Sequence, residues 1–347
     1  RVRVIDVMEM ASFGVDDLGV ETISEFRAES AFRDGLAEVL SRARNRLCVS
    51  TGHGELPSAP SAFDGSRPHW AQAARRLESD GVELVELAMV SSEALAQCES
   101  LLVFGPARPF SSEELVAFAG YLAAGGNTTI ALRTQPAPGQ SELLPSGLEL
   151  LLEGRGMFVL DARVVDPAAQ LGIGAAWGTS EGYGEHEIVA EFQKRRVTVW
   201  DSPIALAPAK DGSVDVLVSA SSEGWAEHSY AREGQPVQQD TDDSDTRSIA
   251  LASDEGARVV LFGSAESLSS EWSARGIGGN TRLLTLATLW TLGRRVQGRA
   301  ENKRPEQLRL LMTETQLRGA FLWCVVAGPL LYAIVGALFW WWRRRED

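Results

Sequence analysis

A histidine and a glutamate lie two residues apart, at His53 and Glu55, in a chain of 347 residues that holds four histidines. The preceding residues, Leu47–Ser50, are mostly apolar and suit a short buried β-strand. Gly52 and Gly54 flank the histidine and permit the positive φ angles of a tight turn. We therefore expect His53 and Glu55 on a loop at the carboxyl edge of a sheet, where ligands usually bind in open α/β proteins.

A histidine and a carboxylate at such an edge suit general-base catalysis or metal binding. The other histidines, at positions 69, 186 and 228, have no spacing that joins them to His53 in a metal-binding motif. A turn in which His53 and Glu55 hydrogen-bond to neighbouring loops is our leading interpretation. Ligand contact, and then metal binding or catalysis, are the alternatives, and no metal is assigned.

Three more polar side chains follow predicted strands. Ser264 and Glu266 come after the strand at Arg258–Phe262, and Asp166 comes after the strand at Met157–Val165. Asp166 would reach the same edge only if its strand runs parallel to the others. The sequence therefore gives seven candidate ligand- or partner-binding residues: Gly52, His53, Gly54, Glu55, Asp166, Ser264 and Glu266.

The remaining pattern alternates strands and helices. Apolar runs predict strands at Val82–Leu87, Leu101–Phe104 and Thr128–Leu132, with helices at Trp70–Ser79 and after the N-cap Ser111. This order predicts an α/β fold with a mostly parallel sheet flanked by helices. Further elements are expected as a strand at 2–7, a helix at 32–43, strands at 157–165, 196–200 and 214–220, an antiparallel pair at 248–252 and 258–262, and a last helix capped by Asn280.

Composition narrows the classes of partner. The formal net charge of −14 argues against nucleic acid, because a phosphate backbone would be repelled. The three cysteines, Cys48, Cys98 and Cys324, show no zinc-binding spacing. Cys48 and Cys98 could form a bridge, but we expect two small buried hydrophobic side chains, because free cysteine is commonly buried.

A membrane segment is expected at the end of the chain. Gly319–Trp342 is 24 residues without a charge, which as a helix would span roughly 36 Å. Pro329 should kink or loosen that helix near its middle. By the positive-inside rule the arginines that follow stay in the cytoplasm, so the preceding domain is extracytoplasmic. The residues expected to anchor the chain are Trp340, Trp341, Trp342, Arg343, Arg344 and Arg345.

Several short motifs occur in a specific order. Thr51-Gly52-His53-Gly54-Glu55 is followed by Phe104-Gly105-Pro106, the segment Ser111–Gly126, Val164-Val165-Asp166-Pro167 and the block Arg258–Ser269. Over residues 25–345 this order, with its closing apolar helix, resembles the extracytoplasmic auxiliary component of gliding-motility-type ABC transporters.

The resemblance implies a domain similar to class I glutamine amidotransferases and a subunit held in the bacterial inner membrane. It also implies an ABC permease and an ATPase as partners, a sister auxiliary chain as a further candidate, and a ligand on the extracytoplasmic side. Members usually carry an N-terminal span as well. We expect upstream sequence to be missing, because residue 1 is arginine and residues 1–28 look like the remnant of an earlier α/β segment.

The sequence lacks the motifs of covalent catalysis and of nucleotide hydrolysis. An amidotransferase-like site would need a cysteine at the turn Gly105-Pro106-Ala107, and none is present. There is also no GxxxxGK[ST] phosphate loop. We expect no catalytic residue, no cofactor and no enzymatic activity. The alternatives are an extracytoplasmic hydrolase or amidase that uses His53 and Glu55, and a purely structural envelope scaffold.

The expected division of the chain follows from these segments. The extracytoplasmic domain spans 29–298, a juxtamembrane linker spans 299–318, the transmembrane helix spans 319–342, and a cytoplasmic tail spans 343–347.

Overall fold

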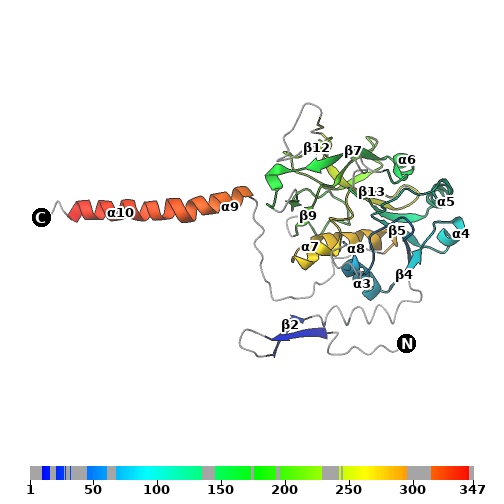
Figure 1. Cartoon of the computed structure of the whole chain (residues 1–347), viewed down its shortest axis with the longest axis horizontal. Helices are drawn as coiled ribbons and strands as arrows, with labels where there is room; N and C mark the ends of the chain where they lie inside the picture. The colour runs from blue at the N-terminus through cyan, green and yellow to red at the C-terminus, as the bar shows by residue number, and fades with distance from the viewer. Residues whose placement is uncertain are drawn as a thin grey trace.

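The computed structural model describes residues 10–15, 21–26, 28, 32, 45–60, 68–134, 145–172, 176–192, 196–228, 242–243, 245–294 and 314–343. The strand expected at 2–7, nearly all of the helix expected at 32–43, and Arg344 and Arg345 lie outside these residues. The described part contains a large α/β domain and one long C-terminal helix (Figure 1).

The main sheet has ten strands in the order β12-β7-β10-β13-β14-β6-β5-β3-β4, with β11 also paired to β13. Two further pairs, β1-β2 and β8-β9, form small antiparallel sheets. The strands are β1 (Ala11–Val15), β2 (Glu21–Phe26), β3 (Asn45–Ser50), β4 (Val82–Leu87), β5 (Ser100–Phe104), β6 (Asn127–Ala131), β7 (Met157–Val165), β8 (Trp177–Thr179), β9 (Thr198–Trp200), β10 (Ile204–Pro208), β11 (Asp215–Ser219), β12 (Trp225–Glu227), β13 (Ser248–Ser253) and β14 (Val259–Phe262).

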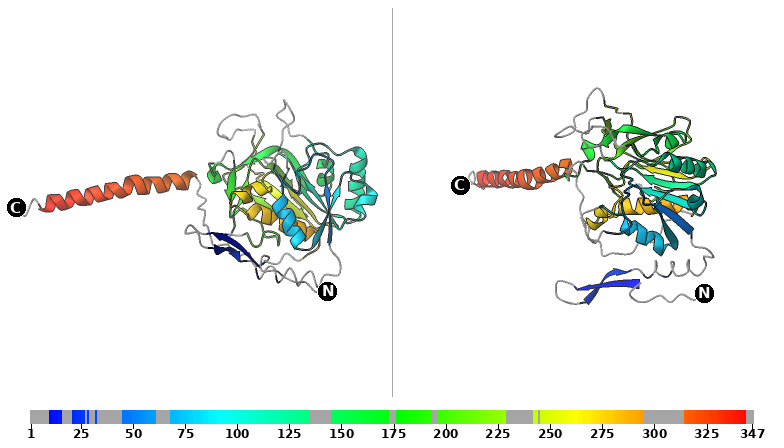
Figure 2. Two further views of the ribbon diagram at one scale, coloured as in Figure 1. Left: turned by 60° about the horizontal axis from the view of Figure 1, so that its bottom comes forward. Right: turned by 45° about the vertical axis from the view of Figure 1, so that its right-hand side comes forward.

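Helices cover both faces of this sheet (Figure 2). They are α3 (Ala71–Ser79), α4 (Ser92–Leu95), α5 (Ser112–Ala123), α6 (Glu149–Glu153), the short turn η1 (Pro167–Ala169), α7 (Ser270–Ala274) and α8 (Gly279–Thr291). The strands β14, β6, β5, β3 and β4 pair in parallel. The predicted α/β class, with a mainly parallel central sheet between helices, is confirmed.

The alternation of side chains along β5 shows why this strand is apolar throughout. Leu102 and Phe104 belong to the core formed with α3 and α8, while Leu101 and Val103 belong to the core formed with α5. All four side chains are fully buried. A parallel strand covered on both faces has no wet side, so every position is apolar.

The predicted start of α5 is also confirmed. The Ser111 hydroxyl accepts the backbone N–H of Glu114, and the Glu114 carboxylate in turn accepts the N–H of Ser111. Such a capping box satisfies backbone N–H groups that the first turn of a helix leaves without partners. Glu114 is 8% exposed, so it lies inside the protein at the carboxyl edge of the sheet.

The structure departs from the predicted elements in two further ways. The strands β8, β10 and β12 were not predicted, because runs of three to five residues are too short to show periodicity. Asn280 does not cap the last helix: Gly278 is the N-cap residue, and Asn280 lies fully buried in the first turn. Its amide accepts from the N–H of Val199 and donates to the carbonyl of Val199, so it joins α8 to β9.

The expectation of two free buried thiols is wrong. Cys48 on β3 and Cys98 before β5 form a disulfide with a Cα–Cα separation of 5.6 Å. The sequence could not decide this, because the two residues become neighbours only when β4 and α4 return the chain to the side of β3. Cys324 is a free, exposed cysteine on the C-terminal helix.

One helix in the described residues is long and apolar enough to cross a membrane. It runs over 26 residues, Arg318–Arg343. Its most apolar stretch of 18 residues has a mean hydropathy of 2.1, and none of that stretch is buried. It takes in the end of α9 (Glu314–Phe321), the π-helical stretch η2 (Leu322–Ala327) and α10 (Gly328–Arg343). Pro329 is the second residue of α10, two positions after η2 ends at Ala327, and the wider π-helical turn before it relieves the clash of its ring with the preceding turn. The predicted local loosening is confirmed.

Loss of the disulfide should destabilise the domain. Cys98→Ser opens a covalent loop with a sequence separation of 50, which should lower the free energy of unfolding by about 2–4 kcal/mol. Urea unfolding of the full chain in mild detergent, followed by tryptophan fluorescence, measures this difference. The matched control is Cys324→Ser, which removes an exposed thiol and should leave the midpoint unchanged. Equal midpoints for the two variants would contradict the bridge.

Candidate functional site

The turn after β3 lies at the carboxyl edge of the parallel strands, and its polar groups are joined to the next loop. The carbonyl of His53 accepts the N–H groups of both Ala107 and Arg108, at 2.8 and 3.0 Å. The Arg108 guanidinium donates to the carbonyl of Gly52 at 2.8 Å. In the sheet, β3 lies between β4 and β5, and the chain runs from β3 to β4 before it returns to β5 on the other side. The loop after β3 and the loop after β5 therefore flank the point where the strand order reverses. They are hydrogen-bonded to each other across that point.

The His53 ring is held on every side. Its Nε2 lies 3.0 Å from a Glu114 carboxylate oxygen, and its Nδ1 lies 3.5 Å from Glu55. The ring stacks on Phe110 with a centroid distance of 4.0 Å. Glu55 accepts the backbone N–H of His53 at 2.6 Å, which closes the turn on itself. Only 8% of His53 and 7% of Glu55 is exposed. A general base needs access to a substrate proton, and this geometry gives His53 little.

Glu114 is the centre of this network. One oxygen accepts the N–H of Val90, and the other accepts from the backbone and hydroxyl of Ser111 and faces His53. Burial raises the pKa of the Glu114 carboxyl, but the hydrogen bonds from Ser111, Val90 and His53 outweigh that effect and lower the pKa to about 2. The carboxylate therefore stays ionised and bound at neutral pH.

Arg133 joins the candidate residues on the other side of the turn. It follows β6, and its guanidinium donates to the carbonyl of Gly54 and to the Glu266 carboxylate, each at 3.1 Å. Glu266 stands in the loop after β14, which is parallel to β6. The structure thus brings Glu266 and the Gly52–Glu55 turn together through an arginine that the sequence interpretation did not consider.

Gly105 explains how these loops approach so closely. Its φ is +69°, and a Cβ at this position would lie 2.9 Å from the Cβ of Ala265. Glycine avoids both the backbone strain and the clash. The loops after β5 and β14 therefore pack against each other without space for a larger side chain.

The two remaining candidates serve the fold. Ser264 is fully buried, and its hydroxyl accepts from the N–H and hydroxyl of Ser267. Asp166 follows β7, which pairs antiparallel with both its neighbours, so the condition for its convergence is not met. Its carboxylate accepts from Ser221 and Ala169 instead. Neither side chain contacts the turn after β3.

The chemistry available here is limited. Among the described residues, no group of three His, Cys, Asp or Glu side chains could hold a metal ion. Sequence reasoning missed Glu114 and Arg133. The sequence predicted an N-cap at Ser111 but gave no sign that Glu114 contacts His53. Arg133 and Glu266 each follow an apolar strand of the sheet, and this shared position was the one sequence signal that could have placed Arg133 near the site.

The low pKa of Glu114 predicts a pH-dependent contribution to stability. A folded-state pKa near 2 against an ordinary value of 4.5 stabilises the protein above pH 4.5, and the gain disappears as the pH falls toward 2. Glu114→Gln should therefore lower the free energy of unfolding by about 2–3 kcal/mol at pH 7. The difference from the wild type should shrink between pH 4.5 and pH 2.

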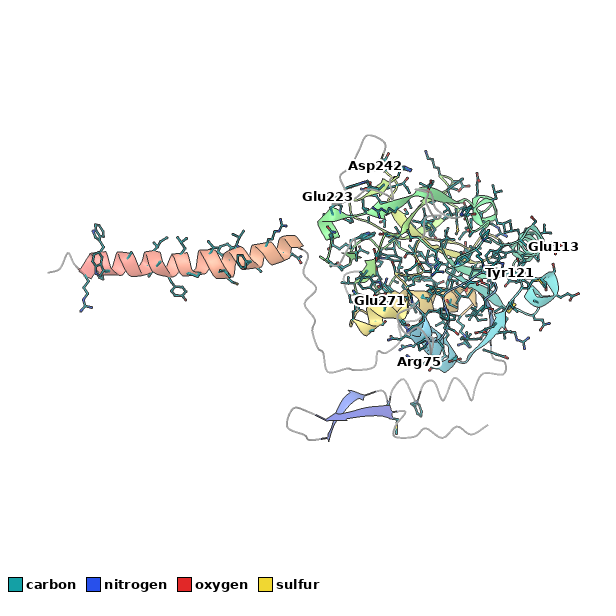
Figure 3. All side chains as sticks on the ribbon, viewed as in Figure 1. Arg75, Glu113, Tyr121, Glu223, Asp242 and Glu271 are labelled. Atoms are coloured by element: carbon teal, nitrogen blue, oxygen red, sulfur yellow. A yellow bond between two sulfur atoms is a disulfide. The ribbon has the colours of Figure 1, made fainter. Side chains whose placement is uncertain are left out.

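Urea unfolding at several pH values measures this effect. Glu113→Gln is the matched control, because Glu113 lies beside Glu114 on α5 but is exposed (Figure 3). A stability difference for Glu114→Gln that did not change with pH would contradict the assignment.

Comparisons with known proteins agree with the fold and go no further. No protein-family model matches the chain, and no curated protein matches it significantly. The structure of the mmIFT52 N-terminal domain is similar, with 16% identity, a TM-score of 0.52, and 74% of this chain and 99% of that one covered. A ThuA-like protein from Bacteroides uniformis gives a TM-score of 0.41 at 14% identity, with 72% of this chain and 93% of that one covered. A ThuA-like protein from Parabacteroides merdae gives a TM-score of 0.38 at 12% identity, with 75% of this chain and 94% of that one covered. At these identities the first match shows a shared α/β fold alone.

Proposed function

We propose that the protein is a non-catalytic, membrane-anchored auxiliary subunit of a bacterial ABC transporter, with an extracytoplasmic domain of the glutamine-amidotransferase type that acts by contact. The observation that carries this proposal is that His53 and Glu55 bind other groups of the same domain. The residues best suited to chemistry hold the loops at the point where the strand order reverses, and both are buried. A domain whose best polar pair is committed to its own structure is suited to binding partners.

The disulfide supports an extracytoplasmic position for the domain. Cytosolic reductants keep most thiols reduced, so stable bridges are typical of the periplasm and of secreted proteins. Cys48 is 1% exposed and lies in β3, between β5 and the edge strand β4. A bridge built into the core of the sheet fits folding in an oxidising compartment.

The C-terminal helix supports the anchor. Its apolar residues are exposed along its length, and Trp340, Trp341 and Trp342 are 50–62% exposed near Arg343. Tryptophans favour the boundary between lipid and water, and arginines stay on the cytoplasmic side. We therefore infer that this helix spans the bacterial inner membrane, with the C-terminus in the cytoplasm and the α/β domain outside.

The transporter partners rest on the order of motifs in the sequence. An ABC permease and an ATPase would supply the translocation path and the energy, because this chain has no phosphate loop. A sister auxiliary chain is a further partner of the same complex.

Purification of the full chain from its native membrane in mild detergent tests the complex. We expect a permease and an ATPase of the ABC type to be recovered with it in fixed proportion. His53→Ala and Glu55→Gln should leave their recovery unchanged. Metal analysis and hydrolase assays on the same sample test the alternative, and turnover of a compound by the purified chain that these substitutions abolish would replace the proposal with an extracytoplasmic hydrolase.

Labelling with a membrane-impermeant maleimide tests the orientation. In a Cys324→Ser background, Glu78→Cys on α3 should react in intact spheroplasts, because that position is exposed on the proposed extracytoplasmic domain. Glu346→Cys in the tail should react only after the membrane is opened. Labelling of residue 346 in intact spheroplasts would contradict the proposed orientation.

A further inference from the structure

The exposed apolar side chains of the α/β domain lie in one helical layer. Outside the C-terminal helix, the large hydrophobic residues exposed from position 45 onward in the described structure are Met89, Val116 and Leu150, which are 66%, 73% and 78% exposed. Met89 precedes α4, Val116 lies on α5 and Leu150 lies on α6. Single exposed hydrophobic residues are ordinary, but three in one layer mark a surface.

Contacts show that these three segments are neighbours. The N–H of Val90, next to Met89, donates to Glu114 on α5. On the other side of α5, a Cβ on Gly147 would lie 3.3 Å from Leu115, and Arg155 donates to the carbonyl of Leu122. The segment that contains α6 therefore follows α5 along its length. We call the outer side of α4, α5 and α6 the acid-rimmed face.

The charged side chains on these three helices have one sign. Glu93 on α4, Glu113 on α5 and Glu153 on α6 are exposed, and none of the three helices carries a lysine or an arginine. The neighbouring arginines, Arg108 and Arg155, donate to backbone carbonyls. The face therefore has an apolar centre and an acidic rim.

The opposite layer differs. Arg75 and Glu78 are exposed on α3, and Glu271 forms an ion pair with Arg275 at 2.6 Å on α7. Its charges are mixed, and among its described residues no large hydrophobic side chain is exposed. Figure 3 shows Glu113 at the right-hand edge of the domain, and Arg75 and Glu271 in its lower part.

We propose that the acid-rimmed face is the docking surface for a protein partner whose contact patch has an apolar centre and a lysine- or arginine-rich rim. The inference rests on the proposed function in one respect, namely that the domain works by contact. Charge selects the partner. A second copy of this chain would bring glutamates against glutamates, and an anionic membrane surface would repel them as well. A basic rim pairs with the acids, while apolar burial at the centre supplies the affinity.

Site-specific photocrosslinking of the full chain in native cells tests the surface. p-Benzoylphenylalanine replaces Val116 or Leu150, with Arg75 on α3 as the matched control position. We expect both test positions to form an adduct with the same other polypeptide, through a segment that contains lysine or arginine, and position 75 to form none with it.

Charge reversal separates this surface from a general apolar contact. Glu93→Lys, Glu113→Lys and Glu153→Lys together should lower the adduct yield about five- to tenfold, because rim charges govern association. Glu78→Lys with Glu271→Lys on the opposite layer should leave it unchanged. All positions are exposed, so each variant should retain the wild-type unfolding temperature.

Several results would overturn the proposal. One is an adduct with a second copy of the chain, with lipid alone or within the same chain, or no adduct at all at positions 116 and 150. Another is an equal adduct yield from position 75. A third is an adduct yield that the triple charge reversal does not change. If the adduct forms with a protein that is not a transporter subunit, the transporter assignment fails while the surface stands. If a permease and an ATPase co-purify but their adducts come from position 75, the surface fails alone.

Discussion

One buried carboxylate holds the carboxyl edge of the sheet together. Glu114 accepts hydrogen bonds from Val90 after β4, from Ser111 before α5 and from His53 after β3. These groups come from loops that follow three strands of the parallel sheet, and the same carboxylate caps α5. A buried charge is costly unless it is fully hydrogen-bonded, and here the partners outweigh the cost, which is why its pKa is low. The position of His53 follows from this arrangement.

The consequence is an edge whose polar groups are occupied with one another. In open α/β sheets the loops at the point of strand-order reversal usually leave a crevice for a ligand. Here the carbonyl of His53 takes two N–H groups of the facing loop, and Arg133 joins Gly54 to Glu266. Loops pinned in this way form a firm platform. Such a platform suits a domain that presents fixed surfaces to partners. The acid-rimmed face, with its exposed apolar and acidic side chains, is the surface that we propose for docking.

The disulfide and the C-terminal helix point to the same setting. The bridge ties β3 to the segment that leads into β5, next to the edge that Glu114 organises. The helix beyond the domain is long and apolar enough to cross a membrane, and its described apolar side chains are exposed. The proposed membrane anchor and the proposed extracytoplasmic position of the domain rest on these two features.

The sequence by itself determined the features that depend on local pattern. The continuous apolar runs of β5 and β14, the alternation in β4, the N-cap at Ser111 and the apolar C-terminal helix each carry a signal within a few residues. The tertiary structure alone decided which distant groups meet. The Cys48–Cys98 bridge, the contact of Glu114 with His53, and the role of Arg133 join residues 50, 61 and 79 or more positions apart, and no local period encodes them. The direction of β7, which removes Asp166 from the turn, is likewise set by strand pairing, because the same alternating pattern fits a parallel or an antiparallel neighbour.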